Sequence, residues 1–181
     1  MKKKIFYWSP CLNPVGTVIS TINSAISLSK YDKNNEVCLI NACGEWNDYK
    51  DKFKNSNVKL YNLCFNYFSY LPKNGYLGSR LSYFIIYLIS FLPLLIILKK
   101  NKPDFLIFQL ITSLPLTLLN FFSFNTKFIL RISGYPKINL LRKKFWSISS
   151  KKISIITCPT EDLLNDIRNI NIFQKDKLKY L

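Results

Sequence analysis

The chain alternates short, almost wholly apolar runs with longer segments whose apolar residues recur at helical spacing. Such alternation is typical of a parallel β-sheet covered by helices, and strands without polar residues are expected where both sheet faces are covered. A length of 181 residues fits one such domain. We therefore predict an α/β fold, a single Rossmann-like parallel sheet with helices on both faces. The expected strands are residues 5–8, 37–40, 58–63, 105–108, 128–130 and 153–156, and the expected helices are 17–30, 45–54, 77–100, 115–122, 138–149 and 160–169.

The chain is strongly basic, because 26 Lys and Arg residues outnumber 10 Asp and Glu residues and give a net charge of +16. One cause could be a genome whose codons favour lysine. Another could be an anionic partner, such as a membrane surface, a phosphorylated substrate or a nucleic acid. A nucleic-acid interface needs exposed aromatic residues among the basic ones, whereas most aromatic residues here lie within apolar runs. We therefore expect no nucleic-acid partner, while codon usage, a membrane surface and a phosphorylated substrate remain open as causes of the charge.

Histidine is absent, and the five cysteines form no C-x-x-C pair. Zinc sites draw mainly on paired Cys or His, so we expect no metal and no other cofactor. Unpatterned cysteines are typical of buried, reduced thiols in a cytosolic protein. The apolar run after the basic residues 1–4 covers only residues 5–8, which is too short for a signal peptide. We therefore expect a cytoplasmic location.

Residues 81–98 contain no charge, and as a helix they reach about 27 Å, just under the thickness of a bilayer core. Three alternatives stay open: an ordinary helix of the domain, a helix that also lies on a membrane surface, and a true span. Pro93 inside the run weakens the third, as does the need to split the sheet across a bilayer. Polar-tipped residues also recur on one stripe, which makes the helix amphipathic. They are Tyr76, Arg80, Tyr83, Tyr87 and Ser90.

The turn after the first expected strand leads to Gly16 and Thr17, at the start of a helix. Ligands of parallel α/β sheets bind beyond the carboxyl ends of the strands, and free N–H groups at a helix start can hold an anion. A purely structural role is that the glycine lets the turn close. Neither G-x-G-x-x-G nor a Walker lysine is present, which argues against a dinucleotide or ATP site.

The segment R-I-S-G-Y-P, residues 131–136, follows another expected strand. Arg131 can bind a phosphate or a carboxylate through its planar guanidinium group. Ser133 and Gly134 follow it, and Gly134 helps to end the strand sharply. The segment therefore predicts a ligand contact at the same edge of the sheet as Gly16.

Two further strand ends carry polar residues. Gln109 opens a segment that reaches Ser113 just before a proline, and Thr160 with Glu161 opens the last expected helix. Capping of the following helices would explain both hydroxyl groups without any ligand. Asp104 is expected at the opposite edge of the sheet, so no convincing catalytic set emerges and the catalytic residues stay unknown.

Three segments resemble the amino-terminal domain of family 4 glycosyltransferases that build bacterial cell-surface polysaccharides. They are K-P-D-F-L-I-F-Q-L-I-T-S-L-P-L (102–116), F-I-L-R-I-S-G-Y-P-K (128–137) and I-I-T-C-P-T-E (155–161). The resemblance implies a GT-B fold, in which an acceptor-binding and a donor-binding domain face each other across a cleft. It implies that residues 1–181 are the acceptor-binding domain and that the donor-binding domain is missing. It also implies metal-free transfer from a nucleotide sugar to a glycan or lipid-linked acceptor.

The resemblance places Gly16 in the turn near donor phosphate and acceptor, and Gln109 where relatives often have a histidine. Arg131, Ser133 and Gly134 match a loop that faces the cleft, and Thr160 and Glu161 match the loop that opens the last helix. The expected substrate-binding residues are therefore Gly16, Thr17, Gln109, Ser113, Arg131, Ser133, Gly134, Thr160 and Glu161.

Peripheral attachment to the inner face of the cell membrane is common in that family. We expect a basic patch facing anionic lipid, made of Lys99, Lys100, Lys102, Arg142, Lys143 and Lys144. Two hypotheses about function follow. The chain is the acceptor half of a glycosyltransferase, inactive alone, or it is a non-catalytic membrane-surface module or split subunit with the same fold.

Overall fold

The computed structural model describes residues 2–14, 16–109 and 114–180. Over these residues seven strands form one sheet in the order β3-β2-β1-β4-β5-β6-β7, and every neighbouring pair is parallel. The strands are β1 (Lys4–Trp8), β2 (Glu36–Asn41), β3 (Val58–Asn62), β4 (Phe105–Gln109), β5 (Lys127–Arg131), β6 (Ile155–Cys158) and β7 (Leu178–Tyr180). The helices are α1 (Gly16–Tyr31), α2 (Lys50–Phe53), α3 (Gly75–Asn101), α4 (Leu114–Phe121), α5 (Leu140–Ser150) and α6 (Glu161–Asn169).

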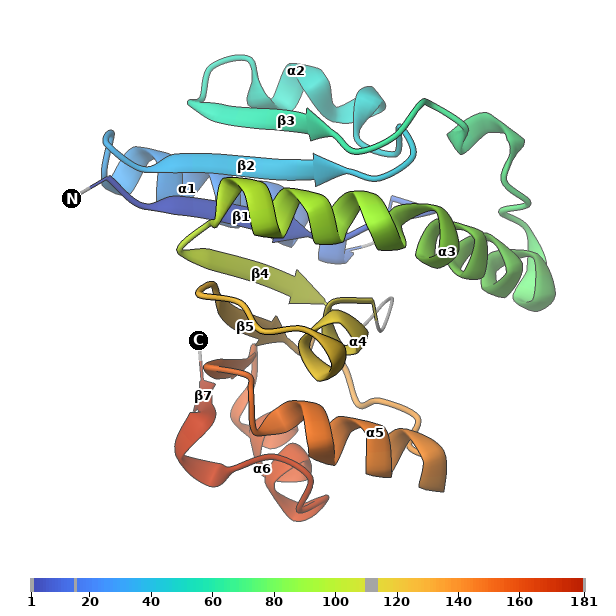
Figure 1. Cartoon of the computed structure of the whole chain (residues 1–181), viewed down its shortest axis with the longest axis vertical. Helices are drawn as coiled ribbons and strands as arrows, with labels where there is room; N and C mark the ends of the chain where they lie inside the picture. The colour runs from blue at the N-terminus through green and yellow to red at the C-terminus, as the bar shows by residue number, and fades with distance from the viewer. Residues whose placement is uncertain (1, 15, 110–113, 181) are drawn as a thin grey trace.

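Two apolar cores hold the helices on the sheet. Helices α3, α4 and α5 lie in front of the sheet in Figure 1, and their buried residues share a core with Trp8, Phe108 and Leu130 of the strands. Helix α1 lies behind the sheet, where Ile22 packs against Tyr7 of β1 in the second core. The expected α/β fold, with helices on both faces of a parallel sheet, is confirmed.

The sheet has one more strand than the sequence predicts. Strand β7 has three residues, of which only Leu178 is buried, and it pairs with the edge strand β6. A single buried residue between lysines makes no apolar run, so the pattern that predicts the other strands has nothing to detect. The expected helix over residues 45–54 is also shorter, a 3₁₀ turn at Asn47–Tyr49 followed by α2.

Helix α3 is amphipathic, but the later part of its polar stripe, from Tyr83 to Ser90, faces the domain, whereas Tyr76 and Arg80 are exposed. Ser90 is fully buried, and the Tyr87 hydroxyl donates a hydrogen bond to Thr117 Oγ1 at 3.0 Å. Apolar side chains occupy the outer side instead, and Leu77 and Leu92 are 79% and 63% exposed. We call this outer row the α3 ridge; it consists of Leu77, Leu81, Phe84, Leu88, Leu92 and Ile96.

Helix α3 is the one helix of the described residues that is long and apolar enough to cross a membrane, judged by length and composition. A third (33%) of its apolar window is nevertheless buried in the domain, where Ile86, Leu94 and Leu98 belong to the core. Its amino-terminal part extends past the carboxyl ends of β1 and β2 (Figure 1). Pro93 leaves the Ile89 carbonyl without its helical donor, and the Cys64 thiol approaches that oxygen at 3.9 Å.

Candidate binding site at the carboxyl edge of the sheet

Strand order reverses at β1, which lies between β2 and β4. Ligand crevices of open α/β sheets form at such a switch point, beyond the carboxyl ends of the strands. Two cavities of about 430 and 290 Å³ lie there, and they share Thr17, Arg131, Ile132 and Ser133 in their walls. The strand ends and the start of α1 therefore form one continuous site, as the sequence predicts for Gly16, Gln109 and Arg131.

The amino-terminal end of α1 forms one wall. Gly16, Thr17 and Ser20 line the larger cavity, and the first turn of the helix contains no acidic residue. A Cβ atom built on Gly16 would meet nothing within 4 Å, and its φ lies outside the left-handed region. Neither crowding nor backbone conformation therefore requires glycine here, which weakens the purely structural role of closing the turn.

Arg131 stands at the centre of the site because it lines both cavities. Its Nη2 donates a hydrogen bond to Ser20 Oγ at 3.0 Å, whereas Nη1 is buried with no acceptor among the described residues. Its charge partly offsets the effect of burial on Tyr7. Burial raises the pKa of that phenol, and the Ser24 hydrogen bond and Arg131 lower it less. Tyr7 therefore stays protonated at neutral pH.

Gln109 ends β4 and is 4% exposed. Its Nε2 donates a hydrogen bond to Thr21 Oγ1 at 3.0 Å, and the Thr21 hydroxyl donates to the Thr17 carbonyl at 2.8 Å. Gln109 lines the smaller cavity while its amide nitrogen ties β4 to α1. Its observed contacts are therefore those of a residue that fixes the start of α1 beside the strands.

The amino-terminal end of α5 supplies the remaining polar wall. Lys137, Arg142 and Trp146 line the smaller cavity, together with Gly134. Asn139 caps the helix, because its Oδ1 accepts a hydrogen bond from the Arg142 backbone N–H at 2.8 Å. The Arg142 side chain donates to the Lys137 carbonyl at 2.7 Å, which holds its guanidinium group near the cavity.

Not all of the expected residues meet at this site. The structure brings together Gly16, Thr17, Gln109, Arg131, Ser133 and Gly134. Thr160 and Glu161 line neither cavity, and Thr160 Oγ1 accepts a hydrogen bond from the Leu163 N–H at 3.2 Å as the cap of α6. Ser113 lies outside the described residues.

Several wall residues escape the sequence analysis. Thr157, Cys158 and Pro159 line the larger cavity in the place expected of Thr160 and Glu161. Ser20 lies one turn beyond Gly16 on α1, so helical spacing is the signal that would have found it. Lys137 ends the segment 128–137 that carries the resemblance, whereas Trp146 gives no signal in the sequence because its position depends on how α5 packs.

Few of the described wall residues are suited to proton transfer. Among the described residues that line the two cavities there is no carboxylate, and Cys158 is the one thiol. Burial raises the pKa of the Cys158 thiol, and Arg168 opposes this only in part. No cluster of three or more Cys, Asp or Glu side chains suited to a metal ion occurs within the described ranges. The described walls therefore offer hydroxyl groups and cations to a polar ligand.

A buried carboxylate lies in the loop after β2, outside both cavities. Glu45 is 1% exposed and accepts hydrogen bonds from the Ala42 and Cys43 N–H groups at 2.9 and 2.8 Å. Burial raises the pKa of Glu45 despite these donors. Burial and the same carboxylate together raise the pKa of Cys11 to about 12, so that thiol stays unreactive. The five cysteines are free, as the sequence predicts, and Cys64 alone is only half-buried.

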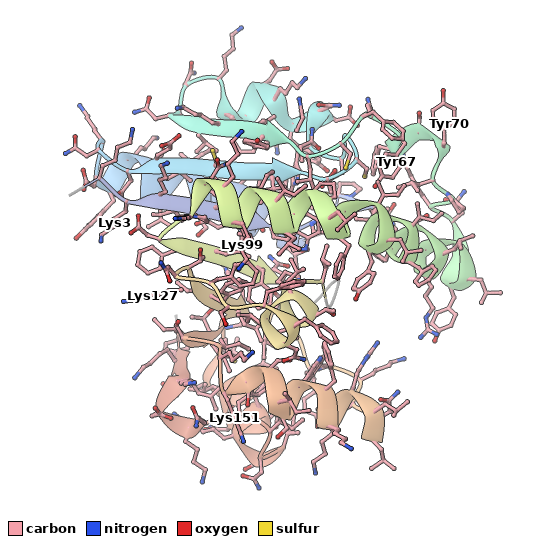
Figure 2. All side chains as sticks on the ribbon, viewed as in Figure 1. Lys3, Tyr67, Tyr70, Lys99, Lys127 and Lys151 are labelled. Carbon is pink, nitrogen blue, oxygen red and sulfur yellow. The ribbon has the colours of Figure 1, made fainter. Side chains whose placement is uncertain are left out.

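The six expected membrane-contact residues form two groups instead of one patch. Lys99, Lys100 and Lys102 end α3, which leads to the amino end of β4, whereas the group at 142–144 opens α5 beyond the carboxyl end of β5. Figure 2 shows Lys99 on the side of Lys127, away from Tyr70. Lys99 also donates a hydrogen bond to the Ser123 carbonyl at 2.9 Å. The two groups therefore lie at opposite edges of the sheet.

Comparison with solved structures finds this fold in glycosyltransferases. The apo form of the lipopolysaccharide outer core galactosyltransferase WaaB matches 98% of this chain with 44% of its own, at a TM-score of 0.54 and 16% identity. SsfS6, a glycosyltransferase of Streptomyces sp. SF2575, matches 88% of this chain with 51% of its own, at a TM-score of 0.53 and 10% identity. The chain thus spans about half the length of these structures.

No family model matches the chain, and no curated protein matches its sequence. At identities of 16% and 10% the likeness to solved structures shows the fold. The seven-stranded parallel sheet and its helices are an α/β Rossmann-like domain of the kind found in GT-B glycosyltransferases.

Proposed function

We propose that this chain is the acceptor-binding, amino-terminal domain of a glycosyltransferase related to family 4. A donor-binding domain, in the same protein or in a separate subunit, would supply the nucleotide sugar. The acceptor would be a cell-surface polysaccharide or a lipid-linked glycan. The observation that carries this proposal is the pair of adjoining cavities at the switch point, lined by hydroxyl groups and cations without a carboxylate. Such walls can form hydrogen bonds with the hydroxyl groups of a sugar.

The proposal is tested by glycan-array binding of the purified chain. Gly134→Trp is a suitable blocking variant, because a Cβ at Gly134 meets nothing within 4 Å and the residue lines the smaller cavity. The matched control is Asn34→Trp, in a separate cavity at the amino edge. We expect the chain to bind a subset of bacterial surface glycans, G134W to lose that binding and N34W to keep it. Equal loss in both variants, or no glycan binding at all, contradicts the proposal.

The alternative is a membrane-surface module without a role in transfer. The two functions differ in their activity when a donor-binding domain and a nucleotide sugar are supplied. An acceptor domain restores transfer that needs Arg131 and Ser133, whereas a membrane module restores none. Residues 1–181 alone are expected to transfer nothing in either case, because under this proposal donor binding and charge stabilisation at the reacting bond come from the donor-binding domain.

We also propose that the domain attaches peripherally to the cytoplasmic face of a membrane through the α3 ridge. The ridge is an apolar row on a helix that contains no acidic residue, and Arg80, Lys99 and Lys100 flank it. Anionic lipid complements both the row and these charges. A second copy of the chain would bring like charges together, so a lipid surface is the occupant that the charges favour.

Co-sedimentation with vesicles tests this attachment. Wild type is expected to sediment with phosphatidylglycerol vesicles more than with phosphatidylcholine vesicles, and less as salt increases. Replacing Leu88 and Leu92 together by Gln should reduce sedimentation, whereas Tyr31→Gln, on exposed α1 surface, should not. Equal binding to both vesicle types rejects the electrostatic part, and unchanged binding of the double variant rejects the ridge.

A further inference from the structure

Three cations line the smaller cavity, and none of them has an anionic partner among the described residues. Arg131, Lys137 and Arg142 face it, and its described walls contain no Asp or Glu. The ion pairs found among the described residues all lie at the amino edge of the sheet, where Glu36 and Asp104 hold lysines. The described residues therefore give the three cations around the smaller cavity no ion pair.

Two helix ends add to this positive charge. Helices α1 and α5 both begin at the site, and neither has an acidic residue in its first turn. The amino-terminal end of a helix carries a partial positive charge, so cations there are unfavourable. Helix α5 nevertheless begins with Arg142, Lys143 and Lys144 in its first two turns. The cations at the start of α5 therefore lower the stability of the helix and favour the binding of an anion there.

Helix α6 provides the contrast within the same sheet edge. It begins with Glu161 and Asp162 and is capped by Thr160. Its positive end is thus neutralised by its own residues, and Thr160 and Glu161 line neither cavity. At the starts of α1 and α5, by contrast, no acidic residue of the first turn neutralises the positive end.

Buried donors at the site also lack acceptors. The Arg131 guanidinium group is held in place by Ser20 through Nη2, while its buried Nη1 has no hydrogen-bond partner among the described residues. The Thr17 hydroxyl, on the shared wall, is buried and likewise without a partner there. Unsatisfied buried polar groups are costly unless a ligand or water satisfies them. Planar guanidinium groups are suited to two-oxygen contacts with phosphate or carboxylate.

We infer that the acceptor bound here is an anionic sugar, whose phosphate or carboxylate lies between Arg131, Arg142 and Lys137 at the start of α5. This inference rests on the proposed function in that it assigns the cavity to the acceptor. The inference goes beyond the proposed function by naming the chemical class of that acceptor. Neutral glycans lack the group that these cations and helix ends are arranged to hold.

Isothermal titration of the full chain with matched sugars tests the inference. The probes are glucose 1-phosphate, glucuronate and the neutral methyl glucoside. At least one anionic sugar should bind roughly tenfold or more tightly than the neutral one, since one charge-assisted hydrogen bond is worth about 1.5–3 kcal/mol and each 1.4 kcal/mol is tenfold. The stronger of the two anionic probes identifies phosphate or carboxylate as the group bound.

Substitutions at the cavity test which residues cause the preference for anionic sugars. Arg131→Gln and the exposed Arg142→Gln should each remove most of the preference for the anionic sugar, and Arg131→Lys should restore only part of it. Lys33→Gln, at the amino-edge cavity, is the matched control and should change nothing. Circular dichroism and thermal unfolding establish that each variant is folded, and Arg142→Gln remains decisive if the Arg131 variants are not.

Three outcomes overturn the inference. The first is equal affinity for charged and neutral sugars, and the second is equal loss of binding in Lys33→Gln. The third is binding of uridine diphosphate that depends on Arg131 and Arg142 while no sugar probe binds, because the site would then hold the donor. Glycan-array binding blocked by G134W, without a preference for anionic sugars, would leave the proposed function standing and refute the inference alone.

Discussion

Single side chains at the carboxyl edge fall into two groups according to what they contact. Gln109 and Thr160 make hydrogen bonds inside the protein that fix β4 to α1 and cap α6. Arg131 is held by Ser20 but retains an unpartnered buried nitrogen among the described residues, and Gly16 opens onto free space. Contacts of the first kind contribute to stability. Arg131 and Gly16 contribute little to the stability of the folded protein, and ligand binding should depend on them.

The buried Glu45 predicts a pH dependence of stability. Burial raises the pKa of Glu45 above its value in the unfolded chain, so the folded state retains a proton that the unfolded state loses. The Glu45 contribution is therefore fully present below the unfolded pKa, near 4.5, and is lost as pH rises through the folded pKa. Glu45→Gln does not titrate, so the stability advantage of wild type over the variant should shrink as pH increases.

Urea unfolding of wild type and Glu45→Gln at a series of pH values from 5 to 8 measures this difference. At pH 5 we expect the variant to be less stable by about 1–3 kcal/mol, because its amide offers one acceptor oxygen to two N–H donors. A difference in the free energy of unfolding that is constant or grows with pH would show that Glu45 is not held protonated.

Gly16→Ala separates binding from stability. A Cβ at Gly16 has open space and no unfavourable φ, so the variant should be as stable as wild type or more stable by about 0.4–1 kcal/mol. Ligand binding should weaken, because the added methyl group narrows the larger cavity. Gly44→Ala is the contrasting variant, since its φ is +104° and its Cβ would contact the Asn66 side chain. Thermal unfolding should show a loss for G44A alone; a loss for G16A would contradict the open space assigned to Gly16.

At the scale of elements, the pattern of apolar residues predicts the strands and helices whose side chains are buried in the cores. The six longer strands follow from apolar runs, and the edge strand β7 does not, because only Leu178 of its residues is buried. The strand-end rule also places Gly16, Gln109 and Arg131 correctly at one edge. The rotation of a helix is less predictable: in α3 Tyr87 faces the domain and donates a hydrogen bond to Thr117, whereas Tyr76 is exposed. Trp146 reaches the site only through the packing of α5.

Helix α6 carries a prediction of its own. Thr160 caps the helix and lines neither cavity, so Thr160→Ala should lower the free energy of unfolding by about 1 kcal/mol. Affinity for glycans should not change. Denaturant unfolding and glycan titration of the same preparation measure both quantities. Loss of glycan affinity with unchanged stability would contradict this prediction and show that Thr160 contacts the ligand.

At the scale of the whole molecule, the two edges of the sheet differ in electrostatics. Acidic residues pair with lysines at the amino edge, as Glu36 does with Lys2 and Lys59. The carboxyl edge combines two cavities, two helix ends and cations that have no anionic partner among the described residues. The α3 ridge lies on the front layer, outside both cavities. The proposed lipid-facing row and the proposed acceptor site therefore lie on different parts of the molecule.

Chemical-shift mapping by nuclear magnetic resonance tests the location of the acceptor site most directly. The labelled chain would be titrated with a glycan that it binds on the array. We predict that the largest amide shifts fall on Gly16, Thr17, Ser133 and Gly134, around the shared walls of the two cavities. Shifts concentrated at the amino edge around Asn34, or along the α3 ridge, with the carboxyl edge unchanged, would contradict the assignment of this edge as the acceptor site.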